Sequence, residues 1–346
     1  YADDEDEEDF NVNELQEIVE TVANPSNEPS INARAAVIYD RTTKKVLWGK
    51  NQDDKRAMAS TTKIMTAIVV LENSSLADTV TISKKAANTG GSRLKINTGD
   101  KITVNDLLYG LMLCSGNDAA VALAEHTAGS VEEFAVLMNN KAQELGLEHT
   151  HFVTPHGLDQ DEHYTTAYEL AVLTDYALNN EKFAQIVNTK SCTVSINGAS
   201  RAISNTNELL GNLNGVNGVK TGYTGNAMRC LVTSCTRDGN QIITVVLGSD
   251  TKKQRTSDSI KLIQYAFSNF ERVNIEEIAQ KEFESWQQIN KSRININKAQ
   301  SENIELELTG IENKIIPLKS GSQKDINIGI NCIYEYEAPV EKGIKV

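Results

Sequence analysis

The fold of this chain is decided by residues 58–71, which read MASTTKIMTAIVVL. The apolar run predicts a buried helix, and Ser60 and Lys63 stand three residues apart near its first turn. Side chains at this spacing share a helix face, with Cβ atoms about 5–6 Å apart, so an amine can lie beside a hydroxyl there. A serine next to a lysine is a candidate activated nucleophile. The plainer interpretation is that Ser60 is an N-cap residue that opens a core helix.

Two further Ser-x-x-Lys motifs occur in the sequence, SRLK at 92–95 and SDTK at 249–252. Both stand next to glycines in turn-like surroundings. Only the motif at Ser60 leads into a long apolar run, which favours it as the catalytic one.

The net charge of −13 comes mostly from one end of the sequence. Residues 1–20 contain ten Asp or Glu and no Lys or Arg, which leaves −3 for the rest. A nearly neutral body argues against nucleic-acid binding. Residues 3–9 are expected to form a disordered acidic tail, and residues 12–22 a short amphipathic helix. No apolar run approaches the length of a transmembrane helix, and the opening residues do not resemble a signal peptide.

The five cysteines exclude a fully paired disulfide framework, because their number is odd. The sequence has no Cys-x-x-Cys, so neither a zinc ribbon nor a redox motif is supported. Free cysteine behaves as a small apolar residue, and we expect five buried thiols.

The order of the predicted elements indicates the fold class. Strands are expected at 33–40 and 45–48, a helical block from about 104 to 187, and further strands at 192–196, 229–236 and 241–248. A helix at 256–270 closes this unit. This order predicts an α/β (α+β) domain in which a mainly antiparallel sheet packs against helices.

The composition changes after about residue 272, where alternation of apolar and polar residues indicates a small all-β domain. We therefore expect an acidic tail with a short helix at 1–32, a catalytic domain at 33–272 and a β-rich C-terminal domain at 273–346. The last domain is expected to be incomplete, because the sequence halts without a finishing strand.

Two short motifs add the groups that acyl chemistry needs beyond a serine and a lysine: a polar relay, a second cation and N–H groups for an oxyanion. Ser115-Gly116-Asn117 supplies a hydroxyl and an amide at a predicted helix start. Lys220-Thr221-Gly222 supplies a cation, a hydroxyl and a residue without a side chain. Ser-x-x-Lys, Ser-Asp-Asn and Lys-Thr-Gly, in this order, are typical of penicillin-binding proteins and class A β-lactamases. Gly116 here stands in place of the aspartate.

Residues 33–270 resemble a low-molecular-weight penicillin-binding protein, a D-alanyl-D-alanine carboxypeptidase with the serine peptidase fold that class A β-lactamases share. The stretches that carry the resemblance are ASTTKIMT at 59–66, CSGNDA at 114–119, HF at 151–152 with HGLD at 156–159, and GVKTGYT at 218–224. The β-rich end of the chain resembles the C-terminal domain of that family.

The resemblance implies three catalytic residues: Ser60, Lys63 and Ser115. Ser60 would attack the carbonyl between two D-alanines. Lys63, kept neutral by burial and by nearby Lys220, would take the Ser60 proton. Ser115 and Lys220 would pass a proton to the leaving D-alanine.

The resemblance also implies a set of substrate-binding residues. Asn117 would orient the substrate amide, and backbone N–H groups of Ser60 and Tyr223 would hold the oxyanion. Gly222 would let the substrate lie along a strand, and Arg255 would grip the terminal carboxylate. The plainer interpretation of Arg255 is a solvated arginine at a helix start. The whole set is Asn117, Lys220, Thr221, Gly222, Tyr223 and Arg255.

The implied function is removal of the terminal D-alanine from peptidoglycan pentapeptide stems through an acyl-enzyme, with no metal and no cofactor. β-Lactam antibiotics would inhibit by acylating Ser60. The family works outside the cytoplasmic membrane, often held by a C-terminal amphipathic helix. We expect an exported protein whose signal peptide is already absent, and whose membrane contact would need an anchor that this sequence does not contain.

Three other functions stay open. A class A β-lactamase would need a glutamate in a Glu-x-x-Leu-Asn segment, and the sequence has none. A zinc peptidase would draw on His149, His151, His156 or His163, although no His-Glu-x-x-His occurs. A lapsed family member would bind peptidoglycan or β-lactams without turnover, but it would be expected to lack a serine or lysine of the set.

Overall fold

The computed structural model describes residues 12–22, 28–299, 304–311, 314–338 and 340. The chain divides into two compact units, Tyr1–Ser268 and Asn269–Val346. The acidic segment at 3–9 lies outside the described residues.

A five-stranded sheet forms the centre of the first unit, in the order β2-β1-β9-β8-β7, with every neighbouring pair antiparallel. The two strands expected at 33–40 and 45–48 are confirmed, and they pair as a hairpin at the edge of the sheet. The α+β class with an antiparallel sheet is also confirmed. The strands are β1 (Ala35–Asp40), β2 (Lys45–Lys50), β7 (Val216–Thr224), β8 (Met228–Arg237) and β9 (Asn240–Ser249).

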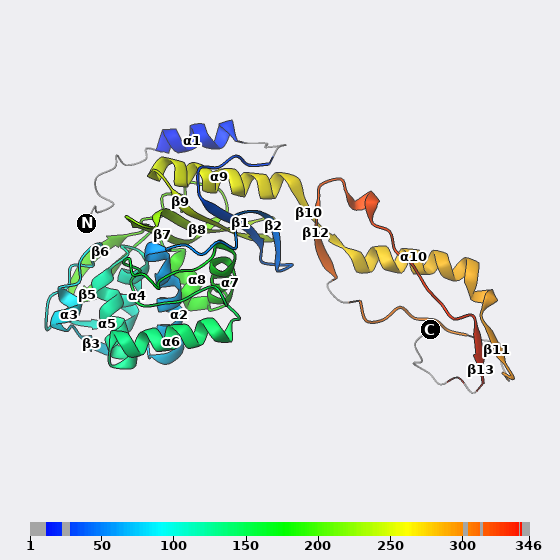
Figure 1. The fold of residues 1–346 in the computed structure, drawn as a ribbon, viewed down its shortest axis with the longest axis horizontal. Coiled ribbons are helices and arrows are strands. Elements are labelled where there is room, and N and C mark those ends of the chain that lie inside the picture. The colour runs from blue at the N-terminus through cyan, green and yellow to red at the C-terminus, as the bar shows by residue number, and fades with distance from the viewer. Residues whose placement is uncertain (1–11, 23–27, 300–303, 312–313, 339, 341–346) are drawn as a thin grey trace. The chain divides into compact units, whose positions relative to one another are not determined.

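Helices cover both faces of this sheet. Figure 1 shows α9 over one face with α1 beside it, and the block of α2 and α4 to α8 on the other. Between the sheet and this block lies the main core, which is built from buried Ile, Val, Leu and Ala side chains. The helices are α1 (Val12–Thr21), α2 (Lys63–Asn73), α3 (Lys84–Ala87), α4 (Val104–Met112), α5 (Asn117–Ala128), α6 (Val131–Glu144), α7 (Ala167–Ala177), α8 (Glu181–Val187) and α9 (Lys252–Asn269).

Local sequence explains where several helices begin. The side chains of Thr103, Ser130 and Thr166 each accept a hydrogen bond from the amide three residues later, at the starts of α4, α6 and α7. Such a cap satisfies one of the amides that the first turn leaves without a partner.

Two small antiparallel strand pairs lie beside the helical block: β3 (Thr79–Thr81) with β4 (Lys101–Thr103), and β5 (Ser191–Ile196) with β6 (Ala199–Ser204).

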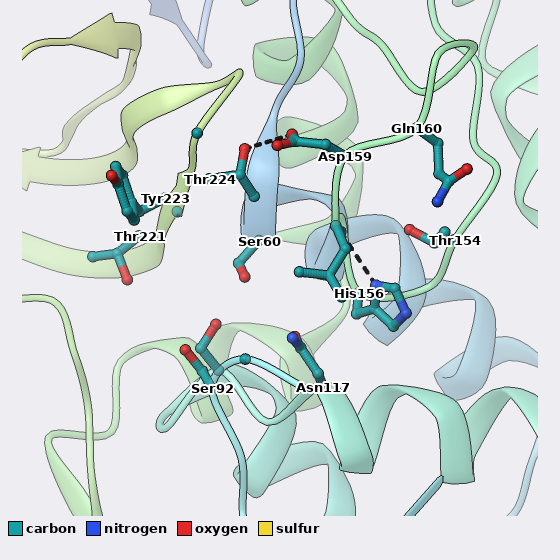
Figure 2. A pocket seen from close by; sticks show the side chains of 15 residues that line it. Ser60, Ser92, Asn117, Thr154, His156, Asp159, Gln160, Thr221, Tyr223 and Thr224 are labelled. Atoms are coloured by element: carbon teal, nitrogen blue, oxygen red, sulfur yellow. Dashed lines mark hydrogen bonds between the residues drawn. The ribbon is translucent and has the colours of Figure 1, made fainter. Parts of the chain in front are cut away.

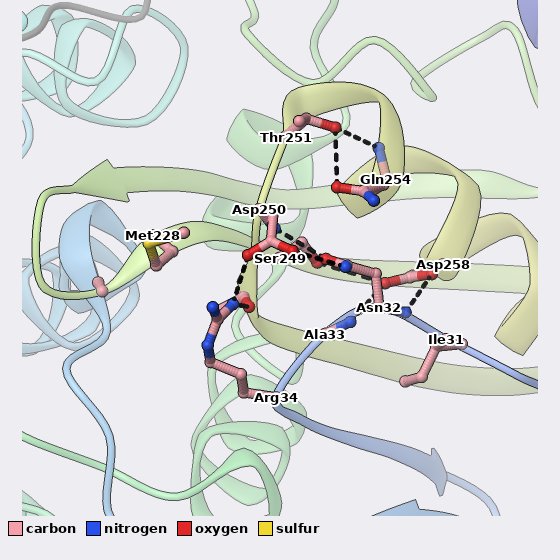
Figure 3. A network of polar contacts seen from close by, with 12 residues as sticks. Ile31, Asn32, Ala33, Arg34, Met228, Ser249, Asp250, Thr251, Gln254 and Asp258 are labelled. Atoms are coloured by element: carbon pink, nitrogen blue, oxygen red, sulfur yellow. Dashed lines mark hydrogen bonds and ion pairs between the residues drawn. The ribbon is translucent and has the colours of Figure 1, made fainter.

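A buried carboxylate joins α9 to the segment that enters β1 (Figure 3). Asp258 is 2% exposed. It accepts hydrogen bonds from the amides of Asn32 and Ala33, at 3.1 and 2.8 Å, and from the Ser249 hydroxyl at 3.3 Å. Because these partners lie in two separate segments, before β1 and at the end of β9, Asp258 fixes the N-terminal half of α9 against the sheet.

The second unit contains the expected small β region, in two strand pairs. β10 (Phe270–Asn274) pairs antiparallel with β12 (Ile315–Lys319), and β11 (Asn295–Asn297) pairs parallel with β13 (Glu335–Glu337). Helix α10 (Ile275–Asn290) separates β10 from β11, so the all-β description is too narrow. The helix-period pattern that fades only near Trp286 was the signal for it.

Two smaller expectations need correction. Helix α9 begins at Lys252 rather than Thr256. All five cysteines are free, but Cys114, Cys192 and Cys332 are only partly buried. Within the described ranges, no helix is long and apolar enough to cross a membrane.

Candidate active site

Ser60 lies in a short 3₁₀ turn, η2 (Ala59–Thr62), directly before α2. Ala59 has a positive φ of 48°, a conformation that costs energy for a residue with a side chain. The N-cap positions of η2 and α2 belong to Met58 and Thr62, so the N-cap interpretation of Ser60 is wrong. The backbone instead presents Ser60 at the wall of a cavity.

Lys63 opens α2 and is completely buried. Its Nζ lies 2.8 Å from Ser60 Oγ, 2.7 Å from Asn117 Oδ1 and 2.8 Å from the His156 carbonyl oxygen. The predicted contact between the serine and the lysine is therefore present.

An ammonium could donate to all three of these oxygens, and an uncharged amine also fits them, with a different direction for the Ser60 contact. The oxygens of Asn117 and His156 can only accept, whereas the Ser60 hydroxyl can donate. A neutral amine has two N–H bonds for the two carbonyl oxygens and keeps one lone pair for the Ser60 proton. Burial and the nearby Lys220 ammonium hold the pKa of Lys63 well below its usual range, although Asp118 opposes this shift.

Ser115 sits on the loop between α4 and α5, with a positive φ of 58°. Asp118 lies in the first turn of α5, directly after this loop. Its completely buried carboxylate accepts hydrogen bonds from the amides of Leu94 and Lys95, both at 2.8 Å. A neighbouring segment of the cavity wall is thereby tied to the start of α5.

Asn117 contributes to the catalytic centre through both ends of its amide. Its Nδ2 donates to the Gly90 carbonyl at 2.8 Å, which leaves Oδ1 directed at Lys63. The structure thus assigns Asn117 a contact with Lys63. The expected contact with the substrate amide stays a prediction.

Lys220, Thr221, Gly222 and Tyr223 lie within β7, the edge strand of the central sheet. Lys220 is 1% exposed, and its Nζ donates to the Thr221 carbonyl at 3.1 Å. The Thr221 hydroxyl bonds to that of Thr206 at 2.7 Å. An edge strand keeps backbone groups available for a further strand, as a peptide substrate would supply.

The loop that contains His156-Gly157-Leu158-Asp159 closes the far side of the cavity. Asp159 accepts hydrogen bonds from the Thr224 hydroxyl at 2.6 Å and from the Asn226 amide at 3.2 Å, which ties this loop to the end of β7. Burial lowers the pKa of His156 to about 3, so this imidazole is neutral at ordinary pH.

These elements enclose a cavity of about 640 Å³. Figure 2 shows Ser60 between Thr221 and Tyr223 of β7 on one side and His156 on the other, with Ser92 and Asn117 below it. The size is typical of ligand sites. Of the predicted site residues, Ser60, Ser115, Asn117, Thr221, Gly222 and Tyr223 line the cavity, while Lys63 and Lys220 lie buried behind its wall.

Arg255 is placed differently from the expectation. It is 1% exposed in the first turns of α9, and its guanidinium is paired with Glu208, which Thr256 also contacts. It is therefore not a solvated arginine, and it is not among the residues that line the cavity. Direct binding of a substrate carboxylate by Arg255 stays a prediction.

The histidines of the zinc alternative have other partners. His149 pairs with Glu169, and the Nδ1 of His151 lies 2.6 Å from the Glu162 carbonyl. Among the residues that the structure describes, no three His, Cys, Asp or Glu side chains are grouped so that they could hold a metal ion.

Sequence reasoning missed several residues of the site. The His156 carbonyl on Lys63 is a backbone group, which no side-chain pattern can reveal. Ser92 and Gly91, set aside as part of a turn, line the cavity, as do Asp159 and Gln160. The HGLD stretch was a signal for this wall, because the resemblance already included it.

A sequence profile of D-alanyl-D-alanine carboxypeptidases matches residues 21–251, about two thirds of the chain. The chain belongs to the D-alanyl-D-alanine carboxypeptidase family. The carboxypeptidase DacF of Bacillus subtilis is 35% identical over 92% of this chain and 81% of the relative. The D-alanyl-D-alanine carboxypeptidase of Streptomyces sp. strain K15 is 38% identical over 72% of this chain and 91% of the relative.

Solved structures of this carboxypeptidase family share the fold. The Streptomyces K15 DD-transpeptidase aligns with a TM-score of 0.67 at 38% identity, over 70% of this chain and 99% of that structure. The carboxypeptidase DacD of Francisella tularensis aligns with the same TM-score at 32% identity. Members of the family are serine peptidases of peptidoglycan metabolism that act outside the cytoplasm, and acylation by β-lactams is typical of them.

Proposed function

We propose that this protein removes the terminal D-alanine from peptidoglycan stem peptides through an acyl-enzyme on Ser60. The arrangement around Lys63 Nζ carries the proposal, because two carbonyl oxygens take its N–H bonds and leave its lone pair for the Ser60 proton. Lys63 can then act as a general base that takes the Ser60 proton directly, with no intermediate group between the two atoms. Family membership supplies the substrate class.

The acylation step follows from this geometry. Ser60 Oγ bonds to the carbonyl carbon between the two D-alanines, and its proton passes to Lys63. Negative charge develops on the carbonyl oxygen, and the backbone N–H groups of Ser60 and Tyr223 stabilise it. The edge of β7 aligns the peptide as an added strand.

The leaving D-alanine needs a proton on its nitrogen. Ser115 at the cavity wall and the buried Lys220 relay to it the proton that Lys63 took from Ser60, so that Lys63 becomes neutral again, the C–N bond breaks and a neutral amine leaves. Water then attacks the ester, the Ser60 hydroxyl re-forms, and the shortened peptide leaves as a carboxylate. A β-lactam acylates the same oxygen, but its leaving group stays tethered and keeps water out.

The cell wall outside the cytoplasmic membrane is the proposed place of action, because family members act there. We further propose that the mature protein is exported and held at the membrane surface by a C-terminal amphipathic anchor. Fractionation of cells that produce the complete gene product tests this. Recovery of the protein in the cytosol would contradict it.

Release of D-alanine from a short peptide ending in D-Ala-D-Ala tests the proposed activity. The unmodified protein should release D-alanine, and EDTA should leave the rate unchanged. Ser60→Ala should abolish release, whereas Ser75→Ala, at an exposed serine outside the cavity, should keep it. Loss with EDTA would favour the zinc alternative, and no release by the unmodified protein would favour a binding module without turnover.

A further inference from the structure

We propose that His163 is a positioning residue that orients the Ser60 N–H toward the oxyanion, acting through Thr62 and the Ala59 carbonyl. The inference rests on the proposed function, in which Ser60 is the nucleophile and its amide an oxyanion donor. His163 does not line the cavity, and it lies 101 residues from Thr62 in the sequence.

The hydrogen bonds of His163 fix which ring nitrogen carries the proton. Its Nδ1 accepts from the amide of Val153 at 2.9 Å, with the Thr154 amide at 3.4 Å. An amide N–H can only donate, so Nδ1 is unprotonated and the proton of the neutral ring is on Nε2. The ring is 3% exposed, and burial lowers the pKa of His163 to about 4, so it is neutral at ordinary pH.

The Nε2 proton determines the direction of the next hydrogen bond. Nε2 lies 2.8 Å from Thr62 Oγ1, to which it donates. Thr62 Oγ1 is also 2.8 Å from the Ala59 carbonyl oxygen, which can only accept. A hydroxyl has one proton, so Thr62 accepts from His163 and donates to Ala59. The hydrogen bonds therefore form a directed chain. The Val153 amide donates to His163, His163 donates to the Thr62 hydroxyl, and Thr62 donates to the Ala59 carbonyl oxygen.

The end of this series is the peptide group that joins Ala59 to Ser60. Because the peptide is planar and trans, its carbonyl and its N–H point in opposite directions. Holding the Ala59 oxygen on Thr62 therefore directs the Ser60 N–H to the other side. Gly222 of β7 lies on that side, since a Cβ placed there would be 3.0 Å from the Ser60 nitrogen.

The Ala59 peptide needs such support. The residue has a positive φ of 48°, a strained conformation for a residue with a side chain that persists only where the surroundings enforce it. Gly157 packs against the same carbonyl, because a Cβ on Gly157 would come within 1.9 Å of the Ala59 oxygen. The position of the Ala59 oxygen is therefore fixed both by packing against Gly157 and by the hydrogen bond from the Thr62 hydroxyl.

A role in packing alone is the competing account, because the His163 ring also meets the Phe152 ring edge-on at 5.8 Å between centroids. Two substitutions separate the accounts. Gln places an amide nitrogen near the position of Nε2 and can keep the bond to Thr62. Asn places an oxygen near the position of Nδ1 and can keep the Val153 bond, but it leaves Thr62 without its donor.

The test measures acylation by a chromogenic β-lactam in single turnovers, with the non-covalent dissociation constant and the acylation rate constant determined separately. Removal of one oxyanion donor costs about 10²–10³ in rate, so a misdirected donor in H163N should cost on the order of tenfold to hundredfold, with little change in dissociation constant. H163Q should recover most of the rate. Equal rate constants for H163N and H163Q would overturn the proposal.

A second pair of variants tests the same path if H163N does not fold. Thr62→Ser keeps the hydroxyl and should keep the acylation rate, whereas Thr62→Val should lower it as H163N does. The double variant H163N/T62V should be no slower than T62V alone, and additive losses would contradict the path. The single variant Ser60→Ala distinguishes the two proposals. If it is still acylated, the proposed function is wrong, whatever the His163 variants show.

Discussion

Gly222 of β7 lies directly against the backbone of Ser60. A Cβ placed on Gly222 would come within 3.0 Å of the Ser60 nitrogen and 3.1 Å of the Ala59 Cβ. Separations of this size are tighter than ordinary van der Waals contact. A side chain at 222 would therefore push the strand that aligns the substrate away from the nucleophile.

Gly222→Ala should consequently lower the acylation rate by roughly severalfold to tenfold, because the neighbouring backbone must shift by a few tenths of an ångström and a misplacement of about 1 Å costs about 10²-fold. Gly225→Ala is the matched control, since a Cβ there meets nothing within 4 Å. Single-turnover acylation by a β-lactam measures both variants. Equal acylation rates for Gly222→Ala and Gly225→Ala would contradict this prediction, because they would show that β7 can shift without loss of alignment.

Lys220→Gln should move the acid limb of the acylation pH profile to higher pH. The Lys220 ammonium is, after burial, the main cause that lowers the pKa of Lys63, so its removal raises that pKa. Lys63 is the base only when neutral, and a higher pKa means that a higher pH is needed to deprotonate it. The pH dependence of acylation measures this shift. Lys85→Gln, at an exposed lysine, is the control.

Asp159→Ala should weaken substrate binding. The variant loses the hydrogen bonds to the Thr224 hydroxyl and the Asn226 amide, which hold the cavity loop to β7. If these hydrogen bonds contribute about 1.4 kcal/mol to the free energy of substrate binding, their loss raises KM about tenfold. Steady-state release of D-alanine gives KM and kcat. Thr224→Ser keeps the hydroxyl partner and should leave KM near its original value, and a tenfold rise there would contradict the account.

Glu208→Gln should destabilise the protein, because Arg255 is 1% exposed and Glu208 is its carboxylate partner. Removal of one member of a buried ion pair typically costs about 3–5 kcal/mol. Urea denaturation measures the free energy of unfolding. Replacement of both residues by methionine should recover much of it, and a Glu208→Gln protein of unchanged stability would show that water reaches the guanidinium.

The parts of the fold that the sequence predicts well depend on neighbours in the chain. The β1–β2 hairpin and α4, which begins at Val104 where the predicted helical block starts, need only local alternation, local periodicity and a Thr103 cap. The order of strands, helical block and strands then suffices for the fold class.

The parts that it predicts poorly depend on residues far apart. Arg255 has a local context typical of an exposed helix start, but its partner Glu208 is 47 residues away. The bond between Thr62 and His163 spans 101 residues, and nothing near either residue indicates it. Glycines within β7 obscure its strand pattern, since glycine is depleted in strands, although the fold needs Gly222 there.

The central claim is that Ser60, activated by Lys63, is the residue that becomes acylated. Mass spectrometry of the protein after a brief reaction with benzylpenicillin, followed by peptide mapping, tests it most directly. The account predicts one adduct per chain, located on Ser60, and almost none in Lys63→Met. An adduct on Ser92 or Ser115, or undiminished acylation of Lys63→Met, would contradict it.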